Sequence, residues 1–170
     1  EEYDNEGRCL IAEFDDFILF NCYFPNGQRD HGRVPYKLGF SDAVMEEALK
    51  LKKEKKKEIV ITGDYNTAHT ANDLANPKSN KNSTGFLPNE REWMDKFFAN
   101  GFVDTFRHFT PEGNGHYTWW TYRSNCREKN VGWRIDYFCV TEEFMPKVSA
   151  SYHRPDVLGS DHCPLILEIK

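Results

Sequence analysis

The chain has 170 residues, of which 39% are hydrophobic and 29% are charged, and its formal net charge is −5. This composition excludes a disordered chain, and no apolar run approaches the ~20 residues that a membrane span needs. The negative charge argues against broad, non-specific attraction to polyphosphate. A nucleic-acid partner would have to be held by a local surface and by bound cations. We expect one domain over residues 1–170.

The cysteines are odd in number and scattered, and none forms a CxxC pair. This pattern favours reduced thiols in a cytoplasmic protein over a disulfide framework or a zinc site. The acidic and polar start of the chain does not resemble a signal peptide, which also favours a cytoplasmic location.

Two apolar-rich segments near the start of the chain predict a β-hairpin. Arg8–Phe14 and Phe17–Phe24 flank Asp15 and Asp16, which supply the turn. Residues 35–57 then carry apolar side chains at helical spacing and end in lysines, as a helix C-terminus favours. We interpret these lysines as a solvated face.

A buried strand is predicted at Ile59–Asn66, because the segment opens with consecutive β-branched apolar residues. Gly63 interrupts the run, and Asp64 and Asn66 follow. Side chains two apart on an extended segment point the same way. This carboxylate and amide can therefore face one site, suited to a hard cation or a proton transfer. The alternative is a turn that only caps the strand.

The rest of the chain mixes strands and helices without strict alternation, which favours the α+β class. A helix is predicted from an N-cap at Asn89, with Glu92 three residues on, to a stop at Gly101. The polar residues 67–84 form either a functional loop or a disordered one. Further predicted elements are strands at Tyr117–Tyr122 and Trp133–Val140, a short helix at Glu142–Val148 and a last strand at Leu165–Ile169.

Asp136 falls within a predicted strand, where an apolar side chain is expected. A buried carboxylate needs a partner. One interpretation is a structural salt bridge with Arg134 or Arg107. The other is a carboxylate that orients an imidazole, fixes its tautomer and favours its charged form. The Asp161–His162 dipeptide offers that imidazole, although alone it is also explained by chance or by capping.

Together these polar residues suit the hydrolysis of a phosphodiester. Asp64 or His162 could deprotonate a water, and a cation held by carboxylates could act as a Lewis acid on the phosphate. All-oxygen ligation would suit Mg²⁺ or Mn²⁺ rather than zinc. The candidate residues are Asp64, Asn66, Asp136, Asp161 and His162.

Longer motifs follow one another in chain order: Tyr23–Asn26, Gly63–Asn66, Glu90–Met94, Val103–Arg107, Trp119–Arg123, Asn130–Tyr137 and Gly159–Pro164. This series resembles the exonuclease III branch of the apurinic/apyrimidinic (AP) endonucleases and covers nearly the whole chain. The resemblance implies a two-sheet β-sandwich flanked by helices. It also implies a base-excision repair nuclease that uses Mg²⁺ or Mn²⁺ and cuts double-stranded DNA 5′ to an abasic site. Exonuclease (3′–5′) and 3′-phosphodiesterase activities are implied as well.

The resemblance also implies roles for individual residues. Asp64 would handle the attacking water, Asn66 would help to position it, and Tyr23 would contact the phosphate. His162 would be the active-site histidine, with Asp136 as its orienting partner. The implied metal ligands are Asp64, Asn66, Asp161 and His162.

The implied DNA contacts lie on the loops around this site. Trp119, Trp133 and Ile135 would wall a pocket for the flipped-out baseless sugar, which costs less to extrude than a paired nucleotide. Without the resemblance, the tryptophans would be interpreted as core. The full set of implied DNA-binding residues is Asn26, Arg29, Trp119, Trp120, Arg123, Trp133 and Ile135.

The chain resembles the C-terminal two thirds of this family's fold. We therefore expect that N-terminal strands of both sheets and a glutamate metal ligand lie outside it. Without them, strand edges would be unpaired and cation affinity would fall, so the isolated chain is expected to be weakly active or inactive. Two alternatives are a non-catalytic fragment that binds damaged DNA and a phosphatase or phospholipase of the wider endonuclease/exonuclease/phosphatase superfamily.

Overall fold

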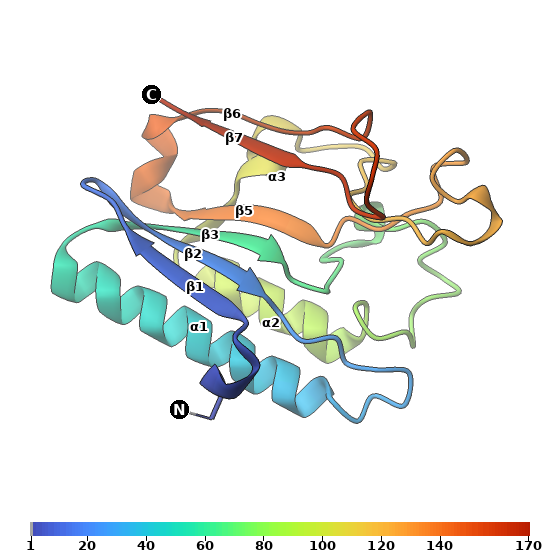
Figure 1. Ribbon diagram of the computed structural model, residues 1–170, viewed down its shortest axis with the longest axis horizontal. Helices are drawn as coiled ribbons and strands as arrows, with labels where there is room; N and C mark the ends of the chain where they lie inside the picture. Colours follow the sequence, from blue (N-terminus) through green and yellow to red (C-terminus); the bar gives the residue numbers. More distant parts are fainter. Residues whose placement is uncertain (1) are drawn as a thin grey trace.

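The computed structural model describes residues 2–170, and its centre is a five-stranded mixed sheet in the order β1-β2-β3-β5-β4 (Figure 1). β2 and β3 run parallel, and the other neighbouring strands are antiparallel. β6 and β7 form a separate antiparallel pair. The strands are β1 (Cys9–Glu13), β2 (Phe17–Tyr23), β3 (Glu58–Asp64), β4 (Phe102–Asp104), β5 (Asp136–Thr141), β6 (Val148–His153) and β7 (Leu165–Ile169).

Two helices cover one face of the large sheet, and β6 and β7 lie over the other (Figure 1). α1 (Val34–Lys55) and α2 (Pro88–Ala99) pack their apolar side chains on β2 and β3 to form the main core. On the opposite face, Val60 and Val140 pack against Phe144 and Val148. The protein is therefore an α+β fold with two sheets and flanking helices, as predicted. The short helices are η1 (Asp4–Glu6), η2 (Ala71–Asp73), α3 (Thr105–Phe109), η3 (Arg123–Asn125) and η4 (Glu142–Lys147).

The strongest sequence patterns gave the right elements. The hairpin is confirmed as β1 and β2, the lysine-ended helix as α1, the central strand as β3 and the last strand as β7. Lysines fill the last turn of α1, where they complement the partial negative charge of the helix C-terminus. Within residues 2–170, no helix combines the length and the apolarity that crossing a bilayer would require.

Three predictions about elements were wrong. α2 begins at Pro88 and not after Asn89, because Pro88 suits the first helical position and Glu90 accepts from the Leu87 amide. Tyr117–Tyr122 is not a regular strand: Trp119 makes only isolated bridges, to Trp133 and His162. The strand expected from Trp133 begins only at Asp136, and β6 was not predicted at all.

Candidate active site

Three site residues lie side by side because three neighbouring strands end together. The register pairs Tyr23 of β2 with Asp64 of β3, and Asp64 with Asp136 of β5. Gly63 makes this close approach possible, since its φ is +131° and an added Cβ would lie 1.9 Å from the carbonyl oxygen of Cys22. Two carboxylates and a phenol therefore lie next to one another where these three strands end.

Asn66 reaches the site through a turn rather than through strand alternation. Its φ is 50°, in the left-handed region, so the extended-strand argument for Asn66 was wrong. The Asn66 backbone N–H donates to Asp64 Oδ1 over 2.7 Å, and its Nδ2 donates to Asp64 Oδ2 over 3.2 Å. Asn26 Nδ2 donates to Asn66 Oδ1 over 3.0 Å. The turn therefore both caps the strand and fixes the amide beside Asp64.

The partner of Asp136 is the imidazole of His162. The His162 Nδ1 atom lies 2.9 Å from Asp136 Oδ2, and Thr118 Oγ1 donates to that same oxygen over 2.6 Å. The alternative salt bridge with Arg134 or Arg107 is not formed, because both guanidinium groups bind Asp73 instead, at 2.8 and 2.7 Å. The arrangement leaves the Nε2 atom of His162 free of the Asp136 contact.

Electrostatics near the carboxylates favour bound protons or cations. Burial, and then the charge of Asp136, raise the pKa of Asp64 to about 7, although the hydrogen bond from Asn66 opposes this. Burial lowers the pKa of His162, but the hydrogen bond and charge of Asp136 outweigh it and the net pKa is raised. The negative charges of Asp64 and Asp136 repel each other here, and a bound divalent cation would reduce that repulsion.

Asp64, Asp136 and His162 each offer one ligand atom, and these atoms lie within 4.8 Å of one another. The donor set of two carboxylates and an imidazole suits a hard or borderline divalent cation. It shares Asp64 and His162 with the predicted ligands but contains Asp136, and neither Asn66 nor Asp161 belongs to it. Asp161 Oδ2 instead accepts a hydrogen bond from Trp119 Nε1 over 3.0 Å.

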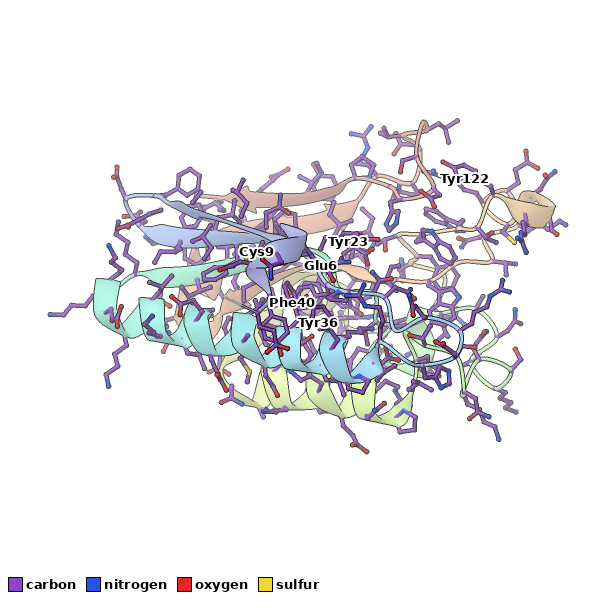
Figure 2. All side chains as sticks on the ribbon, turned by 60° about the horizontal axis from the view of Figure 1, so that its bottom comes forward. Glu6, Cys9, Tyr23, Tyr36, Phe40 and Tyr122 are labelled. Atoms are coloured by element: carbon purple, nitrogen blue, oxygen red, sulfur yellow. The ribbon has the colours of Figure 1, made fainter. Side chains whose placement is uncertain are left out.

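Asp64, Asp161 and His162 open into a cavity of ≈ 410 Å³, and Asp136 lies behind His162 without lining it. It brings together most of the predicted residues: Tyr23, Asn26, Asp64, Asn66, Trp119, Trp133, Ile135, Asp161 and His162. It does not include Asp136, Arg29, Trp120 or Arg123. Trp120 is only 3% exposed, and its indole Nε1 donates to Asn130 away from the cavity. Arg123 opens η3 beside Tyr122, which stands out into solvent at the molecule's edge (Figure 2).

Sequence reasoning missed several residues of the site. The long loop 67–84 and Gly85 contribute Asn80, Ser83, Thr84 and Gly85 to the cavity wall, so this segment is an ordered part of the site. Lys37 is 2% exposed, and its Nζ lies 2.7 Å from Asn66 O and 2.6 Å from Glu90 Oε1. Its place in the buried stripe of α1 was the available signal, because a lysine there needs an anionic partner.

Known proteins with similar sequences are DNA nucleases by name. The chain is 43% identical over 169 residues to an exodeoxyribonuclease of Bacillus subtilis (strain 168), covering 99% of this chain and 66% of that protein. It is 45% identical over 166 residues to a DNA-(apurinic or apyrimidinic site) endonuclease of Dictyostelium discoideum, covering 96% of this chain and 46% of that protein. The chain thus spans less than two thirds of the length of these relatives.

Solved structures with a similar fold, and a family model that matches the sequence, point to the same group of proteins as these relatives. An AP endonuclease of Leishmania major superposes with a TM-score of 0.89 at 30% identity, over 96% of this chain and 55% of that one. An AP endonuclease from Archaeoglobus fulgidus gives 0.87 at 28% identity, over 99% and 67%. Residues 1–162 match the model of the Endonuclease/Exonuclease/phosphatase family. The chain therefore belongs to the Endonuclease/Exonuclease/phosphatase family.

Proposed function

We propose that the protein hydrolyses phosphodiester bonds of double-stranded DNA on the 5′ side of abasic sites, in base-excision repair, and removes 3′ nucleotides and 3′ blocking groups. The observation that carries the proposal is the single cavity in which Asp64, Asn66 and His162 face Trp119 and Trp133. Proton-transfer and phosphate-binding groups there adjoin flat apolar walls. The names of the relatives, exodeoxyribonuclease and AP endonuclease, support the same reaction class.

In this proposal, Asp64 accepts the proton of the attacking water. A base works best when its pKa lies near the working pH, and burial brings the pKa of Asp64 to about 7. Asn66 would hold that water, because its amide is fixed by Asp64 and Asn26. The water would then attack the phosphorus, and the 3′-oxygen of the preceding nucleotide would leave.

Tyr23 and His162 serve the phosphate in this proposal. The phenol of Tyr23 is 55% exposed at the cavity mouth, where it can donate to a phosphoryl oxygen. Asp136 keeps His162 oriented and favours its charged form, which stabilises negative charge as the bond breaks. A divalent cation, Mg²⁺ or Mn²⁺, held by Asp64 and either Asp136 or Asp161, would add Lewis-acid stabilisation of the same charge. His162 would join these ligands only in its neutral form.

Substrate choice would depend on the aromatic walls. Trp119 and Trp133 meet through a backbone bridge, and Ile135 packs against them, so the cavity floor is apolar. Such a floor accepts a sugar without its base, and an abasic site loses no base stacking when it is extruded. Arg29 and Arg123, which lie outside the cavity, would contact the flanking backbone of the DNA.

The test is incision of a duplex that carries one tetrahydrofuran abasic analogue, with Mg²⁺ and, in parallel, with EDTA. We expect Mg²⁺-dependent cutting 5′ to the analogue, and no internal cut in the undamaged duplex. The rate should be low, because a glutamate metal ligand is expected to lie outside this chain. Asp64→Asn should lower the single-turnover rate by about 10²–10⁴-fold while DNA binding persists. Salt-sensitive binding without incision would reject nuclease activity of this chain and favour a damage-binding fragment. Cutting by Asp64→Asn at the original rate would remove Asp64 as the base.

A further inference from the structure

Cys9 and Cys22 lie directly opposite each other in the β1–β2 hairpin. The Tyr23 N–H donates to Arg8 O over 2.8 Å, so the next pair, Cys9 and Cys22, is a non-hydrogen-bonded pair. Cα atoms of such pairs are about 4.5 Å apart, and their side chains share a face. The two Sγ atoms are 3.2 Å apart. A disulfide spans Cα separations of about 4.4–6.8 Å, so this backbone needs no rearrangement to accept one.

The two thiols differ in a way that assigns their roles. Cys9, which is labelled in Figure 2, is exposed in residues 2–170. It lines a cavity of ≈ 420 Å³ between η1, β1 and α1, whereas Cys22 is 2% exposed. The Cys22 thiol donates its hydrogen bond to Cys9, which lowers the pKa of Cys9 although partial burial opposes it. The same hydrogen bond, with burial, raises the pKa of Cys22. A solvent-borne oxidant therefore meets the more acidic thiol first.

The remaining cysteines provide a comparison within the same chain. Cys139 and Cys163 are buried, and Cys126 is partly exposed. Across residues 2–170, the one hydrogen bond recorded between two thiols joins Cys9 to Cys22. Cys126 is thus a matched control: it is reachable from solvent but has no thiol held against it.

We propose that Cys9 and Cys22 form a reversible oxidation site, at which a hydroperoxide converts the two thiols to a disulfide. The Cys9 thiolate attacks one peroxide oxygen, so that an S–O bond forms, the O–O bond breaks and the departing hydroxide is protonated to water. The Cys22 sulfur then attacks the Cys9 sulfenic acid, the S–S bond forms, and a second water leaves with the Cys22 proton. Two thiols and one H₂O₂ give one disulfide and two waters, and a dithiol reverses the change.

The experiment treats the folded chain with H₂O₂, blocks free thiols with N-ethylmaleimide and maps peptides by mass spectrometry. Cleavage at Glu13 or Asp15 separates the two cysteines, so a disulfide appears as two linked peptides. We expect this linked pair in the monomer band of a non-reducing gel, its loss after dithiothreitol, and at least 10-fold faster loss of the Cys9 thiol than of the Cys126 thiol.

Variants separate the two steps. Cys22→Ser should leave Cys9 as a sulfenic acid that dimedone traps, and Cys9→Ser should abolish the linkage, while Cys126→Ser should leave it unchanged. Circular dichroism of each variant checks that it folds. The peptide mapping of the wild-type chain does not depend on the variants. The proposal is overturned if Cys9 proceeds to sulfinic acid beside a free Cys22, if the linkage occurs only between chains, or if Cys9 reacts no faster than Cys126.

Discussion

The imidazole of His162 and the carboxylate of Asp136 face each other at 2.9 Å, and Thr118 Oγ1 donates to the same carboxylate oxygen. This contact makes Asp136 a positioning residue for His162. Asp136→Asn keeps the shape but removes the charge, so the pKa of His162 should fall and any nuclease activity should drop by about 10–100-fold. An NMR titration of the His162 ring measures the first effect directly. Thr118→Val, which spares the charge, should lower the pKa less; an unchanged pKa in Asp136→Asn would contradict the assigned role.

Asp64 should make the protein less stable as the pH rises. Its pKa is about 7 in the folded chain against 3.8 normally, so the folded state holds this proton more tightly than the unfolded state. The contribution to stability is therefore present below pH 3.8 and is lost as the pH rises through about 7. In EDTA, the free energy of unfolding of Asp64→Asn, measured in urea, should not fall in this way as the pH rises. Relative to the wild type, the variant should therefore become more stable with rising pH, by up to about 4 kcal/mol. Parallel stability curves for the two proteins would count against the raised pKa.

A divalent cation should stabilise the fold by relieving the repulsion between Asp64 and Asp136. At 100 times its dissociation constant, Mg²⁺ should add about 2.7 kcal/mol, seen as a higher Tm than in EDTA. Variants then identify the ligands. If the geometric set holds the ion, Asp136→Asn should reduce the shift more than Asp161→Asn does. If Asp161→Asn reduces the Mg²⁺-induced rise in Tm more than Asp136→Asn does, the ligand set predicted from the sequence is supported instead. If Mg²⁺ raises the Tm of Asp64→Asn as much as that of the wild type, both sets are excluded.

The parts of the fold and of the site that depend on local residue patterns could be predicted from the sequence. Alternating and β-branched residues determined β1, β2 and β3, and the polar residues at their ends marked one edge of the sheet. The anomalous position of Asp136 in an apolar strand indicated the need for a partner, and His162 provides it. These inferences succeed because buried positions are mostly occupied by apolar residues, so a polar residue at such a position stands out in the sequence.

Tertiary contacts decided the rest. The segment Tyr117–Tyr122 has the composition of a strand, yet both Thr118 and Trp119 donate their amides to Trp133 O, which prevents a regular ladder. Trp120 looks the same as Trp119 in sequence but is buried away from the cavity. No local pattern could pair Lys37 with Glu90, which lies 53 residues later. Aromatic composition indicates that a segment packs, but not which face of it meets the site.

The buried pair Lys37–Glu90 links the main core to the candidate site. Both side chains are almost fully buried, and Lys37 also donates to the carbonyl oxygen of Asn66. Lys37→Met should leave the buried Glu90 carboxylate without its ion-pair partner, although the Gly85 and Leu87 amides still donate hydrogen bonds to it. The variant should cost about 3–5 kcal/mol of unfolding free energy in urea denaturation. Lys37→Met/Glu90→Gln should recover part of this loss. The matched surface variant is Lys50→Met, whose partner Glu47 is exposed, and it should cost less than about 0.5 kcal/mol. Equal costs for the two lysines would show that burial of this pair does not matter.

Trp133 distinguishes a recognition wall from simple packing. It lines the cavity and packs against Phe86, and an added Cβ on Gly85 would lie 3.3 Å from its ring. Trp133→Ala would widen the floor enough for a sugar that keeps its base, so the preference for abasic over ordinary sites should fall by roughly 10-fold. The readout is the ratio of single-turnover rates on the two duplexes, which does not depend on the fraction of protein that is folded. Trp120→Ala is the control, because that ring is buried outside the cavity: it should lower stability but leave the ratio alone. If both variants keep the ratio, the role of Trp133 is packing, and discrimination must come from another wall of the cavity.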